Sequence, residues 1–142
     1  MRQEFSFGVI PLRKIEEGVS ILLIFHKGGR HWSFPKGHQD PGETDLETAS
    51  RELKEETNLD IVEYLSKDPY VESYTFYKLH EKILKTVSYY PAFVSGDLKL
   101  QPEEILDARW LSIEEALYRL TFKEAKAICQ KVAELCENWE GF

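Results

Sequence analysis

Short apolar stretches along the chain predict β-strands. Residues 5–12 alternate between apolar and polar positions, with Phe5, Phe7 and Val9 on one side, which is typical of a half-buried strand. Residues 19–25, VSILLIF, form a continuous apolar run that predicts a strand buried on both faces. Further strands are expected at 61–65, 70–79, 83–94 and 107–111, with a hairpin turn at 80–82 and room for a short strand at 32–34 in the loop-like segment 26–43.

One helix is predicted at residues 44–57. Thr44 and Glu47 have the spacing of a capping box, which marks the start of a helix. Asn58 follows the last turn and suits a helix that ends in the left-handed backbone conformation. The apolar side chains of the segment fall on one face, at Leu46, Ala49 and Leu53.

Two more helices are predicted towards the end of the sequence. Ser112 and Glu115 form a second capping box before a helix at 113–120. A last helix is expected at 123–137, and its predicted apolar stripe is Ala127, Ile128, Lys131 and Leu135. The order of strands, helix, strands and helices predicts an α+β sandwich, a mixed β-sheet with flanking helices, in a single domain over 1–142.

Composition excludes several classes of protein. The 142 residues hold 18 Lys and Arg against 25 Asp and Glu, a formal net charge of −7. This balance argues against a general nucleic-acid or membrane-surface binder, because both need basic surface. The sequence has no signal-peptide pattern and no apolar run long enough to span a membrane, so we expect a cytoplasmic protein. Cys129 and Cys136 would lie about 10 Å apart on one helix, too far for a disulfide, and are expected to be reduced.

Three glutamates of the first helix are candidates for metal chemistry. Glu52, Glu55 and Glu56 are spaced at i, i+3 and i+4, so their carboxylates project from one helical face. Like charges at this spacing repel each other, and a divalent cation would relieve that repulsion. Carboxylate oxygens are hard ligands that suit Mg²⁺ or Mn²⁺. The alternative is a solvated acidic face on a surface helix.

The surroundings of these glutamates resemble the Nudix box. In that pattern a Gly is followed after five residues by Glu, after seven more by Arg-Glu-apolar, then by Glu-Glu, and finally by Gly and an apolar residue. The matching residues, within a box at 37–59, are Gly37, Glu43, Arg51, Glu52, Leu53, Glu55, Glu56 and Leu59. The one departure is Asn58 in place of the last Gly, and Asn tolerates the positive φ that this position requires.

The resemblance to Nudix hydrolases carries implications for fold and chemistry. It implies an αβα sandwich in which the box forms loop–helix–loop, and hydrolysis of a nucleoside diphosphate linked to another group. It also implies a divalent metal, Mg²⁺ or Mn²⁺, and an attacking water. Arg51 would hold a catalytic glutamate in orientation, and Glu43 would support the loop through a salt bridge. The implied metal ligands are Glu52, Glu55, Glu56 and the Gly37 carbonyl.

A finer resemblance is to the asymmetric diadenosine tetraphosphate hydrolases of the animal and archaeal type, which release ATP and AMP. It rests on HWSFPKGHQDPGE at 31–43, LKTVSYY at 84–90, EEILDARWLSIEEA at 103–116 and FKEAKA at 122–127. Glu104, or its neighbour Glu103, is implied as a late-loop carboxylate that binds metal or activates water. Phe122 is implied as one wall of an adenine-stacking site, with Tyr77 or Tyr89 as the other. The remaining implied substrate-binding residues are His31, Lys36, His38 and Lys85.

Alternative functions fit parts of the pattern. An RNA 5′-pyrophosphohydrolase, or another Nudix pyrophosphatase acting on a linked nucleoside diphosphate, would use the same box. Bacterial RNA pyrophosphohydrolases have Gln and Gly where this chain has Lys36 and His38. A Nudix-shaped module without catalysis usually lacks a box carboxylate, and here all three are present. We expect a monomer that acts on a small dinucleoside polyphosphate, with no membrane partner and no stable nucleic-acid partner.

Overall fold

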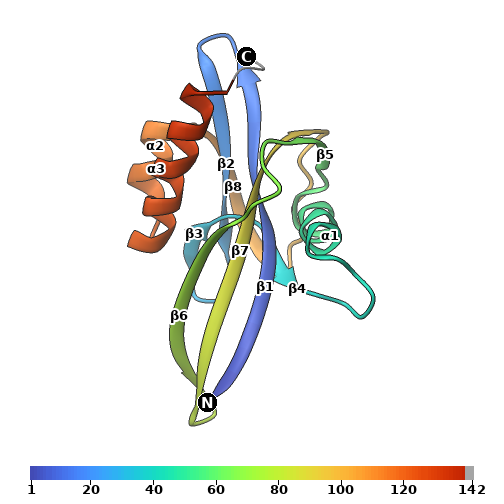
Figure 1. Ribbon diagram of the computed structural model, residues 1–142, viewed down its shortest axis with the longest axis vertical. Helices are drawn as coiled ribbons and strands as arrows, with labels where there is room; N and C mark the ends of the chain where they lie inside the picture. Colours follow the sequence, from blue (N-terminus) through green and yellow to red (C-terminus); the bar gives the residue numbers. More distant parts are fainter. Residues whose placement is uncertain (140–142) are drawn as a thin grey trace.

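A mixed β-sheet with helices on both sides forms the fold, as Figure 1 shows for the computed structural model, which describes residues 1–139. The helices are α1 (Asp45–Thr57), α2 (Ile113–Arg119) and α3 (Lys123–Glu137). The strands are β1 (Arg2–Ile15), β2 (Gly18–His26), β3 (His31–Ser33), β4 (Lys36–His38), β5 (Asp60–Tyr64), β6 (Tyr70–Lys78), β7 (Glu81–Ser95) and β8 (Ile105–Ser112). This arrangement confirms the predicted α+β sandwich. The last three residues of the predicted domain, 140–142, lie outside the described residues.

Strands β1 and β7 form the centre of the sheet. The main path of the sheet runs β3-β2-β1-β7-β5, while β8 joins β2, β4 joins β1 and β6 joins β7. β1 and β7 are parallel, in register from Arg2 opposite Ile83 to Leu12 opposite Phe93. The other described pairs are antiparallel. Because successive side chains of a strand point to opposite faces, the central strands contribute to both helical layers.

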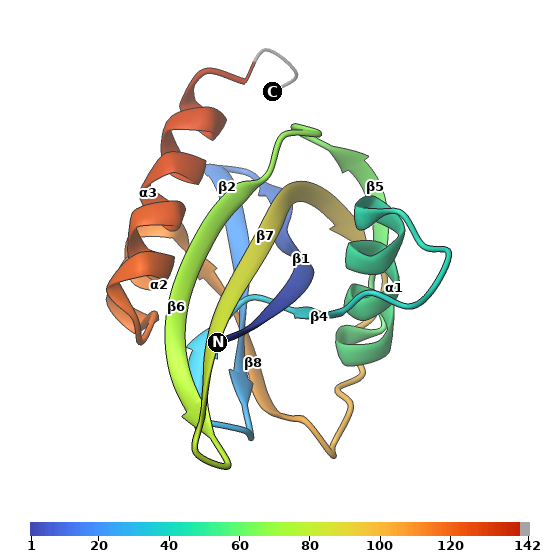
Figure 2. The same ribbon diagram turned by 60° about the horizontal axis from the view of Figure 1, so that its bottom comes forward.

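Figure 2 shows α1 on one side of the sheet and α2 and α3 on the other. Each face of the sheet carries its own hydrophobic core. Val9 and Leu22 belong to the core on the α1 side, together with Leu53 of that helix. Leu23 belongs to the core on the opposite side, together with Val132 of α3. The continuous apolar run of β2 is therefore explained, since its alternate residues are buried under different helices.

Some details differ from the sequence-based expectations. β4 was not predicted. The hairpin between β6 and β7 turns at Leu79 and His80, which both have positive φ, rather than at 80–82. The predicted stripe of α3 is wrong at Ala127 and Lys131, which are exposed. The buried residues of α3 are Ala125, Ile128, Cys129, Val132 and Cys136.

The two cysteines are both free thiols and both buried, which confirms the prediction that they are reduced. Burial raises the pKa of Cys129 to about 12, so this thiol is inert at neutral pH. Within residues 1–139 we find no helix with the length and apolar character needed to span a membrane.

Candidate active site

Helix α1 is fixed at both ends by local interactions. The Thr44 side chain accepts from the Glu47 backbone N–H and the Glu47 side chain accepts from the Thr44 N–H, which confirms the capping box. Asn58 has φ 69° and ψ 9°, as predicted, and its N–H donates to the Lys54 carbonyl. The Asn58 side chain also donates to the Asp97 carbonyl at 3.0 Å. These contacts set the orientation of the helix that carries the candidate carboxylates.

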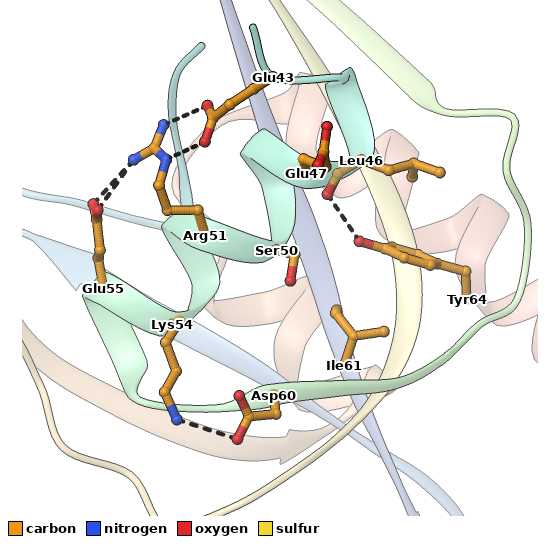
Figure 3. A pocket seen from close by; sticks show the side chains of 10 residues that line it. All are labelled: Glu43, Leu46, Glu47, Ser50, Arg51, Lys54, Glu55, Asp60, Ile61 and Tyr64. Carbon is orange, nitrogen blue, oxygen red and sulfur yellow. Dashed lines mark hydrogen bonds and ion pairs between the residues drawn. The ribbon is translucent and has the colours of Figure 1, made fainter. Parts of the chain in front are cut away.

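Arg51 connects the carboxylates of α1 to the preceding loop. Its guanidinium donates to Glu43 at 2.6 Å and 3.0 Å, to Glu52 at 3.0 Å and to Glu55 at 3.2 Å. It also donates to the His38 carbonyl at 2.8 Å. Figure 3 shows its contacts with Glu43 and Glu55. The hydrogen bonds from Arg51 lower the pKa of Glu43 to about 2, so this carboxylate stays charged and holds the guanidinium in place.

Gly37 lies directly against the carboxylate of Glu52. A Cβ atom at position 37 would overlap with the Cδ and both carboxylate oxygens of Glu52. Gly37 belongs to the short strand β4, opposite Phe7 of β1. The glycine at this position of the box is therefore required by close approach of a functional side chain.

Glu56 and Glu104 complete the acidic side of the site. Glu56 is buried, and one of its oxygens accepts from the Lys36 backbone N–H at 3.1 Å. Burial and then the charge of Glu52 raise the pKa of Glu56 to about 8, and Glu104 acts in the same direction. Burial also raises the pKa of Glu52, against the effect of Arg51, with a further contribution from Glu104. The charge of Glu104, in the loop before β8, therefore acts on both of these helix glutamates.

This donor set fits a hard divalent cation. In the described part of the chain, no three His, Cys, Asp or Glu side chains form a ready-made ligand cluster. Glu52 and Glu55 are instead paired with Arg51, and Glu56 accepts from Lys36. Besides burial, the charge of Glu104 raises the pKa of Glu52 and of Glu56, and the charge of Glu52 raises that of Glu56. A bound divalent cation would relieve that repulsion.

A cavity of about 410 Å³ is lined in part by Lys36, the residue whose backbone N–H donates to Glu56. Phe122 forms part of its wall and lies 5.3 Å from His31, measured between ring centroids. Tyr89 is fully buried, and its hydroxyl lies 3.4 Å from Ser33 Oγ and 3.5 Å from a Glu72 oxygen. The residues that line the cavity are Gly29, His31, Ser33, Lys36, Glu72, Tyr74, Thr75, Tyr89, Phe122, Glu124 and Ala125.

Tyr77, expected as one wall of a stacking site, does not line this cavity. It is 71% exposed and lies opposite Lys82 near the tip of the hairpin. Tyr74 lines the cavity instead, opposite Lys85. The two tyrosines are three positions apart along the strand, so they project from opposite faces of β6. Sequence reasoning missed Tyr74 and Glu72. Their spacing of two positions on one strand places them on the same face, and this was the one signal that could have grouped them.

The basic side of the site gathers around Lys36 and Lys85. Lys85 is buried on β7, beside Glu4 of β1. Burial, with the charge of Lys36, lowers the pKa of Lys85 to about 8. Burial and then Lys85 lower the pKa of His38. Lys36, Lys85 and His38 therefore lie close together, since the charge of Lys36 acts on Lys85 and both lysines act on His38. His31, the fourth predicted residue of this kind, lines the neighbouring cavity.

A second, more open groove of about 660 Å³ lies between α1 and β5 (Figure 3). Arg51 and Glu55 reach its rim. The Tyr64 hydroxyl donates to the Leu46 carbonyl across it at 3.2 Å. Of the predicted substrate-binding residues, His31, Lys36, Tyr89 and Phe122 line the other cavity and none lines this groove, so the groove is a less suitable substrate site.

Comparisons with known proteins identify the family of the chain. The family model of the NUDIX domain matches residues 3–131. The chain is 37% identical over 113 residues to the asymmetrical bis(5′-nucleosyl)-tetraphosphatase of Rattus norvegicus, covering 78% of this chain and 76% of the relative. It is 31% identical over 127 residues to the Caenorhabditis elegans protein of the same name, covering 87% and 90%. The crystal structure of a C. elegans Ap4A hydrolase superposes with a TM-score of 0.70 at 27% identity, over 94% of this chain and 98% of that one. The chain therefore belongs to the Nudix family and is one of its hydrolases.

Proposed function

We propose that this enzyme hydrolyses dinucleoside polyphosphates asymmetrically, converting diadenosine tetraphosphate to a nucleoside triphosphate and a monophosphate, and a longer homologue to two nucleotides that together keep all of its phosphates. For diadenosine tetraphosphate, water attacks phosphorus, one P–O–P bridge breaks, and the products are ATP and AMP. The observation that carries the proposal is the position of Lys36. Its backbone N–H donates to Glu56, and its side chain lines the cavity that contains Phe122. A polyphosphate chain can therefore run from a base in the cavity to the carboxylates of α1.

The acidic residues have distinct roles in this proposal. Glu52, Glu55, Glu56, Glu104 and the Gly37 carbonyl would hold Mg²⁺ or Mn²⁺. A bound cation would neutralise phosphate charge and lower the pKa of a coordinated water. Arg51 keeps Glu52 and Glu55 oriented through the hydrogen bonds described above.

The basic and aromatic residues bind the rest of the substrate. Lys36, Lys85, His31 and His38 would donate to phosphate oxygens. Phe122 and Tyr74 remain 51% and 40% exposed and offer faces on which a base can stack. The names of the rat and nematode relatives support a dinucleoside tetraphosphate as substrate.

The test is a substrate panel with product identification. It contains diadenosine tetraphosphate, its penta- and hexaphosphate homologues, nucleoside triphosphates, and RNA with a 5′-triphosphate or a cap. We expect ATP and AMP in equal amounts from diadenosine tetraphosphate in the presence of Mg²⁺. Two ADP molecules, or cleavage of RNA alone, would contradict the proposal, and the second outcome would favour the RNA 5′-pyrophosphohydrolase alternative.

A substitution links that activity to the carboxylate site. Glu56→Gln should lower turnover about a hundredfold or more, because it removes a major electrostatic group from the reaction centre. Glu63→Gln is the matched control, since Glu63 is exposed on β5 and belongs to neither side of the site. Cytoplasmic location, a monomeric state and the lack of a stable nucleic-acid partner stay predictions.

A further inference from the structure

Two carboxylates that line the cavity, Glu72 and Glu124, have no role in the proposed phosphate chemistry. Glu72, on β6, lines the cavity together with Phe122, Tyr74 and Lys36. It lies on the same face of the hairpin as Tyr74, since the two are two residues apart on one strand. Within residues 1–139 its carboxylate accepts one long hydrogen bond, from the Tyr89 hydroxyl at 3.5 Å.

The surroundings leave Glu72 short of hydrogen-bond donors. It is half-buried, and residues 1–139 provide it with no ion pair shorter than 4.0 Å. Burial and then the charge of Glu124 raise its pKa, so its ionised form is poorly compensated. A buried carboxylate is costly unless donors reach it, and a ligand in the cavity can supply them.

We propose that Glu72 reads the base of the substrate and that the cavity prefers guanine to adenine. This inference rests on the proposed function and narrows the base that the site selects. The guanine edge presents two adjacent donors, N1–H and the N2 amino group, which match the two oxygens of one carboxylate. The adenine edge presents one donor, the N6 amino group, beside the N1 acceptor, and that acceptor opposes a carboxylate oxygen.

The neighbours of Glu72 restrict where its carboxylate can lie. Tyr89 is fully buried, with its ring centroid 5.3 Å from that of Phe34, so its hydroxyl has a fixed position. That hydroxyl lies between Ser33 Oγ and one Glu72 oxygen. The second Glu72 oxygen and the free lone pairs of the first are available to a base stacked against Phe122.

The first experiment needs no substitution. The affinities of GMP, IMP and AMP for the full chain are measured by calorimetry in the presence of Mg²⁺. IMP keeps the N1–H donor of guanine and lacks the N2 amino group, so it separates the two donors. We expect GMP to bind about tenfold more tightly than AMP, with IMP between them. Equal affinities for the three nucleotides would overturn the proposal.

The second experiment exchanges the carboxylate for an amide. Glu72→Gln replaces one acceptor by a donor, so the side chain then matches the donor and acceptor of adenine. GMP should lose about tenfold in affinity while AMP keeps or gains affinity. Glu124→Gln is the matched control, because Glu124 lines the same cavity and loses the same charge. If Glu124→Gln reverses the preference and Glu72→Gln does not, Glu72 is not the base-reading residue.

Hydrolysis separates this inference from the proposed function. The ratio of kcat/KM for diguanosine tetraphosphate to that for diadenosine tetraphosphate should fall in Glu72→Gln and should not fall in Glu124→Gln. If neither dinucleotide is cleaved by the parent, the proposed function fails, while the GMP preference and its loss in Glu72→Gln would still support the role of Glu72. Equal losses of affinity for GMP and AMP in Glu72→Gln would overturn that role whether or not hydrolysis occurs.

Discussion

At the scale of single residues, position 37 requires glycine because of a neighbouring side chain and not because of its backbone conformation. Its φ is not in the left-handed region, so another residue could adopt its conformation. The obstacle is the Glu52 carboxylate, which occupies the space that a Cβ atom would need. Because this carboxylate is the far end of a flexible side chain, it can move aside at little cost to stability. The glycine therefore serves the position of Glu52 more than the stability of the fold.

We expect Gly37→Ala to lower kcat/KM at least about tenfold, because Glu52 must leave its place beside Arg51, while Tm changes little. Gly28→Ala is the control, since a Cβ atom there meets nothing within 4 Å. Activity assays and thermal melting of both variants check the prediction. Full activity of Gly37→Ala would show that the precise position of Glu52 is unimportant.

Asn58 gives a second prediction at this scale. Its positive φ strains any residue with a branched Cβ, so Asn58→Val should lower the free energy of unfolding by about 1–2 kcal/mol. Asn58→Gly relieves the backbone but loses the hydrogen bond to Asp97, so it should stay within about 0.5 kcal/mol of the parent. Chemical denaturation measures both changes. Equal stability of the Val variant and the parent would disprove the conformational argument.

At the scale of elements, the extent and both ends of α1 could be predicted from sequence because its signals are local. Its capping box, its apolar face and Asn58 all lie within the helix or at its ends. β4 could not be predicted, because three residues in a segment rich in Gly and Pro give no periodicity. The strand exists through a distant contact, in which the Val9 N–H donates to the Pro35 carbonyl at 3.2 Å beside the pairing of β4 with β1.

The loop before β8 faces α1, and this leads to a prediction about metal. Mg²⁺ or Mn²⁺ should raise Tm, because a bound cation relieves the mutual repulsion of the carboxylates and binds only the folded chain. Glu104→Gln should reduce this rise, because Glu104 acts on both Glu52 and Glu56. Melting curves with and without the cation give the comparison.

The neighbouring Glu103 provides the control for that experiment. Glu103→Gln removes the same charge one residue away and should leave the metal-dependent rise in Tm as it is in the parent. If Glu103→Gln reduces the metal-dependent rise in Tm and Glu104→Gln does not, Glu103 is the residue that acts on the metal site. Equal rises in the parent and both variants would remove the late loop from the metal site.

At the scale of the whole molecule, the cavity is the part of the site that sequence reasoning predicted least well. It joins side chains from β3, β6, β7 and α3, which are far apart along the chain. The three glutamates of α1 could be found from spacing alone, because a helix fixes their common face. The choice between Tyr74 and Tyr77 had no such guide, since β6 is an edge strand with exposed residues on both faces and shows no clear alternation. Its orientation is set by pairing with β7, where Tyr70 lies opposite Tyr89.

His26 lies behind His31, a residue of the cavity wall, and its protonation affects the stability of the whole fold. It is buried, its ring stacks on His31 with centroids 4.7 Å apart, and its Nε2 has no hydrogen-bond partner within residues 1–139. Burial, followed by the charges of Lys36 and His31, lowers the pKa of His26 to about 3. The folded chain therefore keeps His26 neutral, while the unfolded chain protonates it below its ordinary pKa of about 6.5.

The resulting pH dependence has a definite sign. Because the unfolded state binds more protons between pH 6.5 and 3, His26 destabilises the fold progressively as pH falls through that window. The raised pKa values of Glu52, Glu56 and Glu72 have the opposite effect, since they stabilise the fold as pH falls. The test therefore compares the parent with His26→Phe, in which these glutamates are unchanged. The variant also keeps an aromatic ring against His31. Urea denaturation at pH 7.5 and 5.5 should show the parent losing about 1.4 kcal/mol more than the variant, the full effect of one proton over one pH unit. If the parent and His26→Phe lose the same free energy of unfolding between pH 7.5 and 5.5, His26 does not contribute to the pH dependence of folding. That result would mean that His26 is solvated in the native state and is protonated there as readily as in the unfolded chain.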